Sequence, residues 1–291
     1  MISRICFWLE NSRVFSLPMT ILSWLVIFVY SLKFNGDIFN GFLALIGIAC
    51  GQLATNLFDD YMDYKRLNNN SQQCKCAYIK EGKATLTDVL RVVICYCVIA
   101  LVIGFVLFLR TGYPVIGLAV IGGIIVLLYS KLSQIGLSEL AVGITFGPLL
   151  FEGVYYVMTK NFSFEVLFLS LAVVMFTIGL MYVHTVLDFE GDICSHKKTL
   201  VCRLGDKNKA IKGVWVVYGL GYFFTLIFAI LTKNYLSLAS FILIPLIYIM
   251  YNSLKSFSSG GEVKEFYFRL LKARNLMIYY SLILTTSLLI L

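Results

Sequence analysis

Long apolar segments alternate with short polar ones along the whole chain. Most of the apolar segments have about 18 residues or more, enough for an α-helix to cross the hydrocarbon core of a bilayer. Nine such segments occur, at about residues 15–33, 40–58, 89–109, 113–131, 137–158, 164–187, 213–232, 236–254 and 275–291. The pattern predicts an all-α integral membrane protein, a bundle of about nine transmembrane helices.

The composition agrees with this prediction, and the charges give the bundle an orientation. The chain is 59% hydrophobic and 14% charged, whereas soluble domains carry about 25% charged residues. If the N-terminus is cytoplasmic, the cytoplasmic segments hold 20 of the 24 Lys and Arg residues, as the positive-inside rule requires. The net charge of +8 then reflects topology and attraction to anionic lipids, and we infer no nucleic-acid partner from it.

No polar stretch is long enough to form a separate soluble domain. We expect one transmembrane domain over 1–291 in the cytoplasmic membrane of the cell, with cytoplasmic loops at about 56–88 and 184–212. Because the cytoplasm is reducing, we also expect free thiols at the cysteines of these loops, which are Cys74, Cys76, Cys194 and Cys202.

An acidic cluster follows directly on the second apolar segment, in the stretch NLFDDYMDYKR at 56–66. If the helix continues through it, Asn56 and Asp60 are four residues apart and Asp60 and Asp63 are three apart. All three side chains then share one face of the helix. Asp59 lies about a quarter turn away and is the less suitable member.

A second acidic cluster, LDFEGDICSHKKTL at 187–200, follows the sixth apolar segment. Asp188 and Asp192 are four residues apart and share a face, whereas Glu190 points elsewhere. Either cluster alone could be a solvated helix end. However, acids at the C-terminus of a helix oppose its dipole, and two such clusters on one side of the membrane favour a function.

These residue types indicate metal–diphosphate chemistry. Mg²⁺ prefers carboxylate and carbonyl oxygens, and proteins usually hold it with one or two carboxylates plus substrate phosphates. Two facing clusters would hold a metal–diphosphate between them. Cations that could neutralise the phosphates, and that could equally be ordinary positive-inside anchors, are Arg13, Lys65, Lys131 and Lys198.

The two clusters resemble the aspartate motifs of the UbiA superfamily of intramembrane prenyltransferases, which is also nine-helical. The residues that carry the resemblance are Asn56, Asp60, Asp63, Tyr64, Lys65 and Arg66 in the first motif, and Asp188, Gly191, Asp192, Lys198, Thr199, Leu200, Arg203, Leu204 and Gly205 in the second. The spelling of the first motif, with the stretches at 136–139, 146–148 and 155–157, is similar to the MenA branch, the 1,4-dihydroxy-2-naphthoate prenyltransferases. The resemblance extends over about residues 10–212.

The resemblance implies Mg²⁺-dependent transfer of an isoprenyl group from a prenyl diphosphate to an aromatic acceptor within the membrane, in menaquinone-type biosynthesis. The site would open to the cytoplasm. Carried over by position, the metal–diphosphate ligands are Asn56, Asp60, Asp63, Asp188 and Asp192. The residues implied to bind the diphosphate are Arg13, Lys65, Lys131 and Lys198.

The chain departs from the MenA pattern at three places. His184 replaces an Asn four residues before Asp188, and the stretch 68–70 lacks the usual acid. His184 is either a hydrogen-bond partner in place of the amide, or a general base or extra ligand at the catalytic site. Glu152 replaces an aliphatic residue about 20 Å along the fifth span from Glu139, so it is either functional or protonated and paired within the bundle.

Two other functions compete with this prediction. The nearer alternative is an enzyme of the same superfamily that uses a different acceptor or cyclises the prenyl diphosphate. The more distant one is a membrane transporter, in which intramembrane acids mark an ion path. The acidic clusters lie at one membrane face instead of at mid-bilayer, which favours the enzyme.

Overall fold

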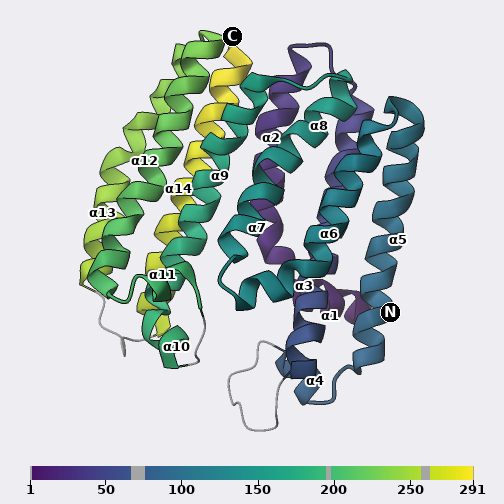
Figure 1. Ribbon diagram of the computed structural model, residues 1–291, viewed down its shortest axis with the longest axis vertical. Helices are drawn as coiled ribbons and strands as arrows, with labels where there is room; N and C mark the ends of the chain where they lie inside the picture. The colour runs from purple at the N-terminus through teal and green to yellow at the C-terminus, as the bar shows by residue number, and fades with distance from the viewer. Residues whose placement is uncertain (1, 67–75, 195–197, 257–262, 291) are drawn as a thin grey trace. The chain divides into compact units, whose positions relative to one another are not determined.

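The computed structural model describes residues 2–66, 76–194, 198–256 and 263–290, and every regular element among them is a helix (Figure 1). Nine helical segments in this described part are long and apolar enough to cross a membrane. The prediction of an all-α protein with about nine membrane-spanning helices is therefore confirmed.

The elements are α1 (Ile2–Asn11), η1 (Val14–Ser16), α2 (Leu17–Leu32), α3 (Ile38–Arg66), α4 (Ala77–Lys80), α5 (Leu86–Thr111), α6 (Pro114–Gln134), α7 (Ser138–Ile144), η2 (Thr145–Leu149), α8 (Leu150–Thr159), α9 (Phe164–Leu187), α10 (Phe189–Cys194), α11 (Leu200–Arg203), α12 (Lys207–Thr232), η3 (Tyr235–Leu243), α13 (Ile244–Lys255) and α14 (Val263–Ile290).

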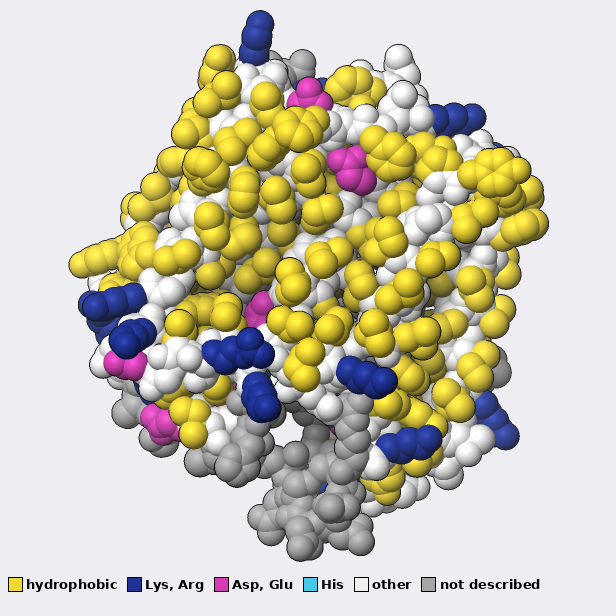
Figure 2. All heavy atoms as spheres, in the orientation of Figure 1, with side chains coloured by type: hydrophobic (Ala, Val, Ile, Leu, Met, Phe, Trp, Pro, Cys, Tyr) yellow, Lys and Arg dark blue, Asp and Glu magenta, His cyan; other side chains and the backbone are white. Residues whose placement is uncertain are grey.

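Large apolar side chains cover the surface of the spanning helices. Figure 2 shows hydrophobic side chains over most of the visible face. On α5, Leu101, Phe105 and Leu109 are each at least 60% exposed. A soluble monomer rarely exposes apolar surface on this scale, so these side chains face lipid in a multi-pass integral membrane protein.

The helices form two compact units, each with its own interior. The first unit comprises Met1–Ile21 and Asp37–Lys131, and the second comprises Leu22–Gly36 and Leu132–Leu291. In the first unit, α3 packs along α5. The interior of this unit continues beyond the spans into α4, where buried Tyr78 and Ile79 join Leu57 of α3 and Val89 of α5 in one apolar cluster.

The second unit is built around α9, the most buried of the spans. Glycines let α9 and α12 approach closely: a Cβ on Gly179 would lie 2.6 Å from the ring of Tyr218, and one on Gly213 would lie 2.1 Å from the hydroxyl of Tyr182. Small residues of this kind are the usual way in which helices pack tightly in membranes. Tyr280 of α14 completes the interior, because its hydroxyl lies 2.5 Å from that of Thr225 on α12.

The fifth span is broken at its middle. Between α7 and α8, the segment η2 has π-helical hydrogen bonding, and Gly147 has non-helical backbone angles directly before Pro148. Proline removes a backbone donor and clashes with the preceding turn, so it kinks a helix.

The last helix begins earlier than hydropathy predicts. The apolar segment begins at about 275, but α14 begins at Val263. Its polar first turns are stabilised by Arg269, which donates to the backbone oxygen of Ser253 at 2.7 Å and pairs with Glu265 at 3.0 Å. Hydropathy alone cannot detect a helical turn whose charges are paired.

A glycine fixes the short connection between α6 and α7. Gly136 has φ +72°, and a Cβ there would lie 1.6 Å from the backbone oxygen of Lys198. The backbone at Lys198 therefore lies directly against this connection. A side chain at position 136 would have to displace the backbone of Lys198, which moves less easily than the end of a flexible side chain.

We predict that Gly136→Ala lowers the stability of the protein by about 2–4 kcal/mol, since it adds a backbone clash to the strain of a positive φ. Gly205→Ala is the matched control, because Gly205 has φ +68° but nothing within 4 Å of its Cβ position. Thermal unfolding in detergent measures the difference. Equal melting temperatures for the two variants would contradict the predicted clash.

Candidate functional site

The first acidic cluster lies on the last turns of α3. The helix continues through Asn56, Asp60 and Asp63 to Arg66, so the predicted helical spacing of this cluster is confirmed. Asp60 is only 2% exposed, whereas Asn56, Asp59 and Asp63 are half-buried. The cluster therefore contains one enclosed carboxylate beside more open oxygen donors.

The buried carboxylate of Asp60 is paired with Arg13. The Arg13 guanidinium donates through Nη2 to Asp60 Oδ1. Arg13 precedes η1 and has φ 60°, the left-handed conformation, which costs a non-glycine residue of order 1 kcal/mol. A buried carboxylate without a partner would cost several kcal/mol, so the pair offsets this backbone strain.

A second residue reaches Asp60 from α4. The Tyr78 hydroxyl donates to Asp60 Oδ2 at 3.4 Å. Burial, and then the nearby charge of Asp60, raises the pKa of Tyr78, so its hydroxyl stays protonated and acts as a donor. The sequence pattern does not predict this contact, because Tyr78 lies far from Asp60 along the chain and no helical or strand spacing connects the two.

A polar network joins α3 to the segment around η1. The Asn56 amide nitrogen donates to the Ser12 backbone oxygen at 3.0 Å, and the Gln52 amide nitrogen donates to Ser16 Oγ at 2.9 Å. The Thr20 hydroxyl donates in turn to Gln52 Oε1. Since the nitrogen of Asn56 is engaged in this way, its carbonyl oxygen is the atom with which it could bind a metal.

The second cluster lies where α9 passes into α10. Asp188 ends α9, and the Asp192 amide donates to the Asp188 backbone oxygen at 2.8 Å, so a helical hydrogen bond crosses the junction. His184 Nδ1 lies 3.4 Å from Asp188 Oδ2, and its ring meets that of Phe266 edge-on at 5.6 Å. Asp192 is 4% exposed, whereas the Asp188 side chain is 41% exposed.

The three lysines expected at the diphosphate are all exposed. Lys65 Nζ lies 4.6 Å from the centre of the Tyr61 ring. Lys131 lies in the last turn of α6, and Lys198 lies in the segment that packs against Gly136. Nearby, Arg203 donates to the Ile135 backbone oxygen, so it stabilises this connection in the second unit.

The first unit thus brings Arg13, Asn56 and Asp60 together, and the second unit brings His184 and Asp188 together. Within the described residues, no group of three or more His, Cys, Asp or Glu side chains could hold a metal by itself. The stretch 68–70 lies outside the described residues.

The expectation of free thiols is wrong for Cys76, because this buried sulfur is disulfide-bonded.

Two further acids belong to the second unit. Glu152 Oε2 accepts a hydrogen bond of 3.4 Å from the Ser163 amide, just before α9, so this carboxylate is paired within its unit, near the α8–α9 connection. Glu139 is 6% exposed. Its Oε2 accepts from the Ser138 hydroxyl at 2.9 Å, but its Oε1 has no hydrogen-bond partner in the described structure.

A model of the UbiA prenyltransferase family matches residues 12–272, which is most of the chain. The chain belongs to the UbiA prenyltransferase family. It is therefore a prenyltransferase, and the predictions of an enzyme and of this superfamily are confirmed. No curated protein matches the chain.

Solved UbiA structures share the fold at low sequence identity. A digeranylgeranylglyceryl phosphate synthase has a TM-score of 0.67 at 17% identity, over 99% of this chain and 100% of that one. A UbiA homologue from Aeropyrum pernix K1, without ligand, has a TM-score of 0.66 at 16% identity. The match covers 93% of this chain and 97% of that one. A UbiA homologue from Archaeoglobus fulgidus, bound to DMAPP and Mg²⁺, has a TM-score of 0.63 at 13% identity. The match covers 98% of this chain and 99% of that one.

Proposed function

We propose that this UbiA protein transfers an isoprenyl group from a prenyl diphosphate to an aromatic acceptor within the membrane, in a reaction that requires Mg²⁺. The observation that carries the proposal is Asp60, a carboxylate enclosed at the end of a spanning helix of a UbiA family member. The Archaeoglobus fulgidus homologue was solved with DMAPP and Mg²⁺ and with GPP and Mg²⁺, which supports this class of donor and this metal.

The residues of both motifs fit such a metal. They offer only oxygen donors, the ligands that Mg²⁺ prefers, and substrate phosphates would complete the coordination. Asp60 already accepts from Arg13 and Tyr78, but a carboxylate has about four lone-pair sites, so it can still bind a cation. The proposed ligands are Asn56, Asp60, Asp63, Asp188 and Asp192.

The chain's own residues support departure of the diphosphate. When bound, Mg²⁺ neutralises the negative charge that builds up on the leaving group. We propose that the exposed ammonium groups of Lys65, Lys131 and Lys198 bind phosphate oxygens. Arg13 pairs with Asp60 through Nη2, and the other N–H donors of its guanidinium are proposed to bind the diphosphate. The allylic C–O bond breaks, the electron pair leaves with the diphosphate, an aromatic carbon attacks the allylic carbon, and loss of a proton or of CO₂ restores aromaticity.

For the acceptor we propose 1,4-dihydroxy-2-naphthoate or a related quinone precursor, as in menaquinone-type biosynthesis. The support is the likeness of the first motif and of residues 136–139 to the MenA branch. Glu139 lies in the second stretch, and its unpartnered Oε1 is suited to accept a hydrogen bond from an acceptor hydroxyl. Transfer to another acceptor, or cyclisation of the prenyl diphosphate, is the alternative within the family.

We also propose that residues 1–291 act as one catalytic domain in the cytoplasmic membrane. The N-terminus and both aspartate motifs would face the cytoplasm. The support is the charge distribution, because 20 of the 24 Lys and Arg residues fall in segments that this orientation makes cytoplasmic.

We predict that Asp60→Asn and Asp188→Asn each reduce the turnover number by about 10²–10³-fold, since each removes a carboxylate charge that would hold the Mg²⁺ that stabilises the leaving diphosphate. The measurement is Mg²⁺-dependent release of diphosphate by purified protein, with mass spectrometry of the prenylated product. Several prenyl diphosphates and aromatic acceptors are tested together, so that donor and acceptor are identified at once.

Glu190→Gln is the matched control for this experiment. Glu190 lies between Asp188 and Asp192 in the chain, but it is exposed and pairs with Lys207 at 3.4 Å, so its loss should leave turnover near the wild-type value. Wild-type activity that persists after chelation of divalent ions would contradict the proposed mechanism.

We predict that His184→Asn changes acceptor preference more than it changes the affinity for prenyl diphosphate. His184 lies one helical turn before Asp188 and contacts it, so it lies near the carbon that an acceptor must approach to within ~3–3.5 Å. Product yields across the acceptor panel are compared with prenyl diphosphate affinity.

The control for this experiment is Phe266→Leu, which removes the ring packed against the imidazole but keeps the contact with Asp188. Unchanged acceptor preference together with weaker diphosphate binding would assign His184 to the metal–phosphate site instead.

A further inference from the structure

Asp60 is held by two donors that come from opposite directions along the sequence. Arg13, before the first span, donates to Oδ1, and Tyr78, after the second span, donates to Oδ2 at 3.4 Å. One contact alone would leave the carboxylate free to rotate about its terminal torsion, which is broad and roughly two-fold. Two donors on different oxygens fix the plane of the carboxylate, and hence the direction of its remaining lone pairs.

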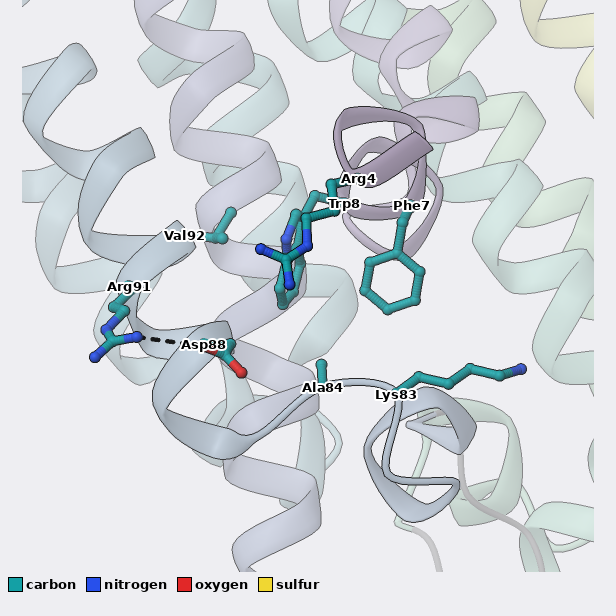
Figure 3. A pocket seen from close by; sticks show the side chains of 8 residues that line it. All are labelled: Arg4, Phe7, Trp8, Lys83, Ala84, Asp88, Arg91 and Val92. Atoms are coloured by element: carbon teal, nitrogen blue, oxygen red, sulfur yellow. Dashed lines mark hydrogen bonds and ion pairs between the residues drawn. The ribbon is translucent and has the colours of Figure 1, made fainter. Parts of the chain in front are cut away.

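Tyr78 is itself held rigidly. It is 6% exposed and belongs to the apolar cluster of the first unit. The rings of Phe7 and Trp8 meet the Tyr78 ring edge-on, at centroid distances of 5.9 and 6.4 Å. Figure 3 shows Phe7 and Trp8 projecting from α1 beside the connection that follows α4, where both line a cavity of about 490 Å³.

The helix α1 is suited to this supporting role because it carries apolar side chains both toward Tyr78 and on its outer surface. Ile5 and Leu9 are 53% and 38% exposed, while Phe7 and Trp8 turn toward Tyr78. A helix with exposed apolar side chains and basic residues nearby is suited to lie in the interface at a membrane surface. The short segment ahead of the first span therefore contributes to the packing around the aspartate motif.

We propose that Tyr78 is a positioning residue for Asp60, and that α1 acts on the same carboxylate through the contact of Phe7 and Trp8 with the Tyr78 ring. This inference rests on the proposed function, in which Asp60 binds Mg²⁺ together with the diphosphate. Groups that orient a metal ligand, without touching the metal, typically contribute about 10–100-fold to metal affinity or activity.

The first test is Tyr78→Phe, which removes the hydroxyl and keeps the ring. We expect the Mg²⁺ concentration for half-maximal activity to rise about tenfold, with an unchanged KM for the acceptor. Tyr222→Phe is the matched control, because Tyr222 is also buried and donates to the Ser240 backbone oxygen at 3.3 Å in the second unit. That variant loses a comparable hydrogen bond and should keep the wild-type Mg²⁺ dependence.

The second test asks whether α1 acts through Tyr78. Phe7→Leu should shift the Mg²⁺ dependence in the same direction by a smaller factor. The Phe7→Leu/Tyr78→Phe double variant should be no worse than Tyr78→Phe, because residues that act through one another are not additive. Additive effects of the two substitutions would overturn the role assigned to α1.

The outcomes separate the two proposals. Equal Mg²⁺ dependence of Tyr78→Phe and Tyr222→Phe, with an active wild-type enzyme, would overturn the positioning role and leave the proposed function intact. Mg²⁺-dependent binding of geranyl diphosphate gives the same comparison without turnover. A wild-type protein that showed neither Mg²⁺-dependent binding nor Mg²⁺-dependent transfer would overturn both.

Discussion

The structure of the first unit depends on one constraint, the burial of the Asp60 carboxylate at the end of a membrane-spanning helix. Removing a carboxylate from water costs several kcal/mol unless charge and hydrogen bonds compensate it. Asp60 is 2% exposed, and the compensation comes from Arg13 and Tyr78. Neither residue belongs to α3, so segments outside the spans must fold onto the end of this helix.

Several local features follow from this requirement. Arg13 takes a left-handed backbone conformation, which ends α1 and turns the chain into η1. Asn56 and Gln52 then tie this turn to α3 by donating to Ser12 and Ser16. These polar contacts hold the turn in place. The Arg13–Asp60 ion pair therefore does not have to offset by itself the conformational entropy cost of ordering the segment that carries Arg13.

The sequence predicts the features that depend on local pattern. The nine spans among the described residues follow from apolar length, and the helical continuation of α3 through Asp60 follows from spacings of three and four residues. Contacts between distant segments have no such pattern. This is why no spacing in the sequence predicts the Arg13–Asp60 pair or the Tyr78 contact, and why Glu152 could not be assigned to the Ser163 amide. The early start of α14 was missed for the same reason, since the partner of Arg269 lies on α13.

Two of the proposed metal ligands, Asp60 and Asp188, differ in a way that bears on their proposed roles. Asp60 is enclosed and held by donors on both oxygens, whereas the Asp188 side chain is 41% exposed and contacts a half-exposed His184 at 3.4 Å. A carboxylate fixed by its surroundings offers a cation the same geometry at every turnover. An exposed carboxylate keeps its rotamers and can follow a ligand as charge moves onto the leaving diphosphate. This difference suits Asp60 to placing the metal and Asp188 to adjusting to the substrate, so substitutions that tune acceptor choice are better sought around His184 than around Asp60.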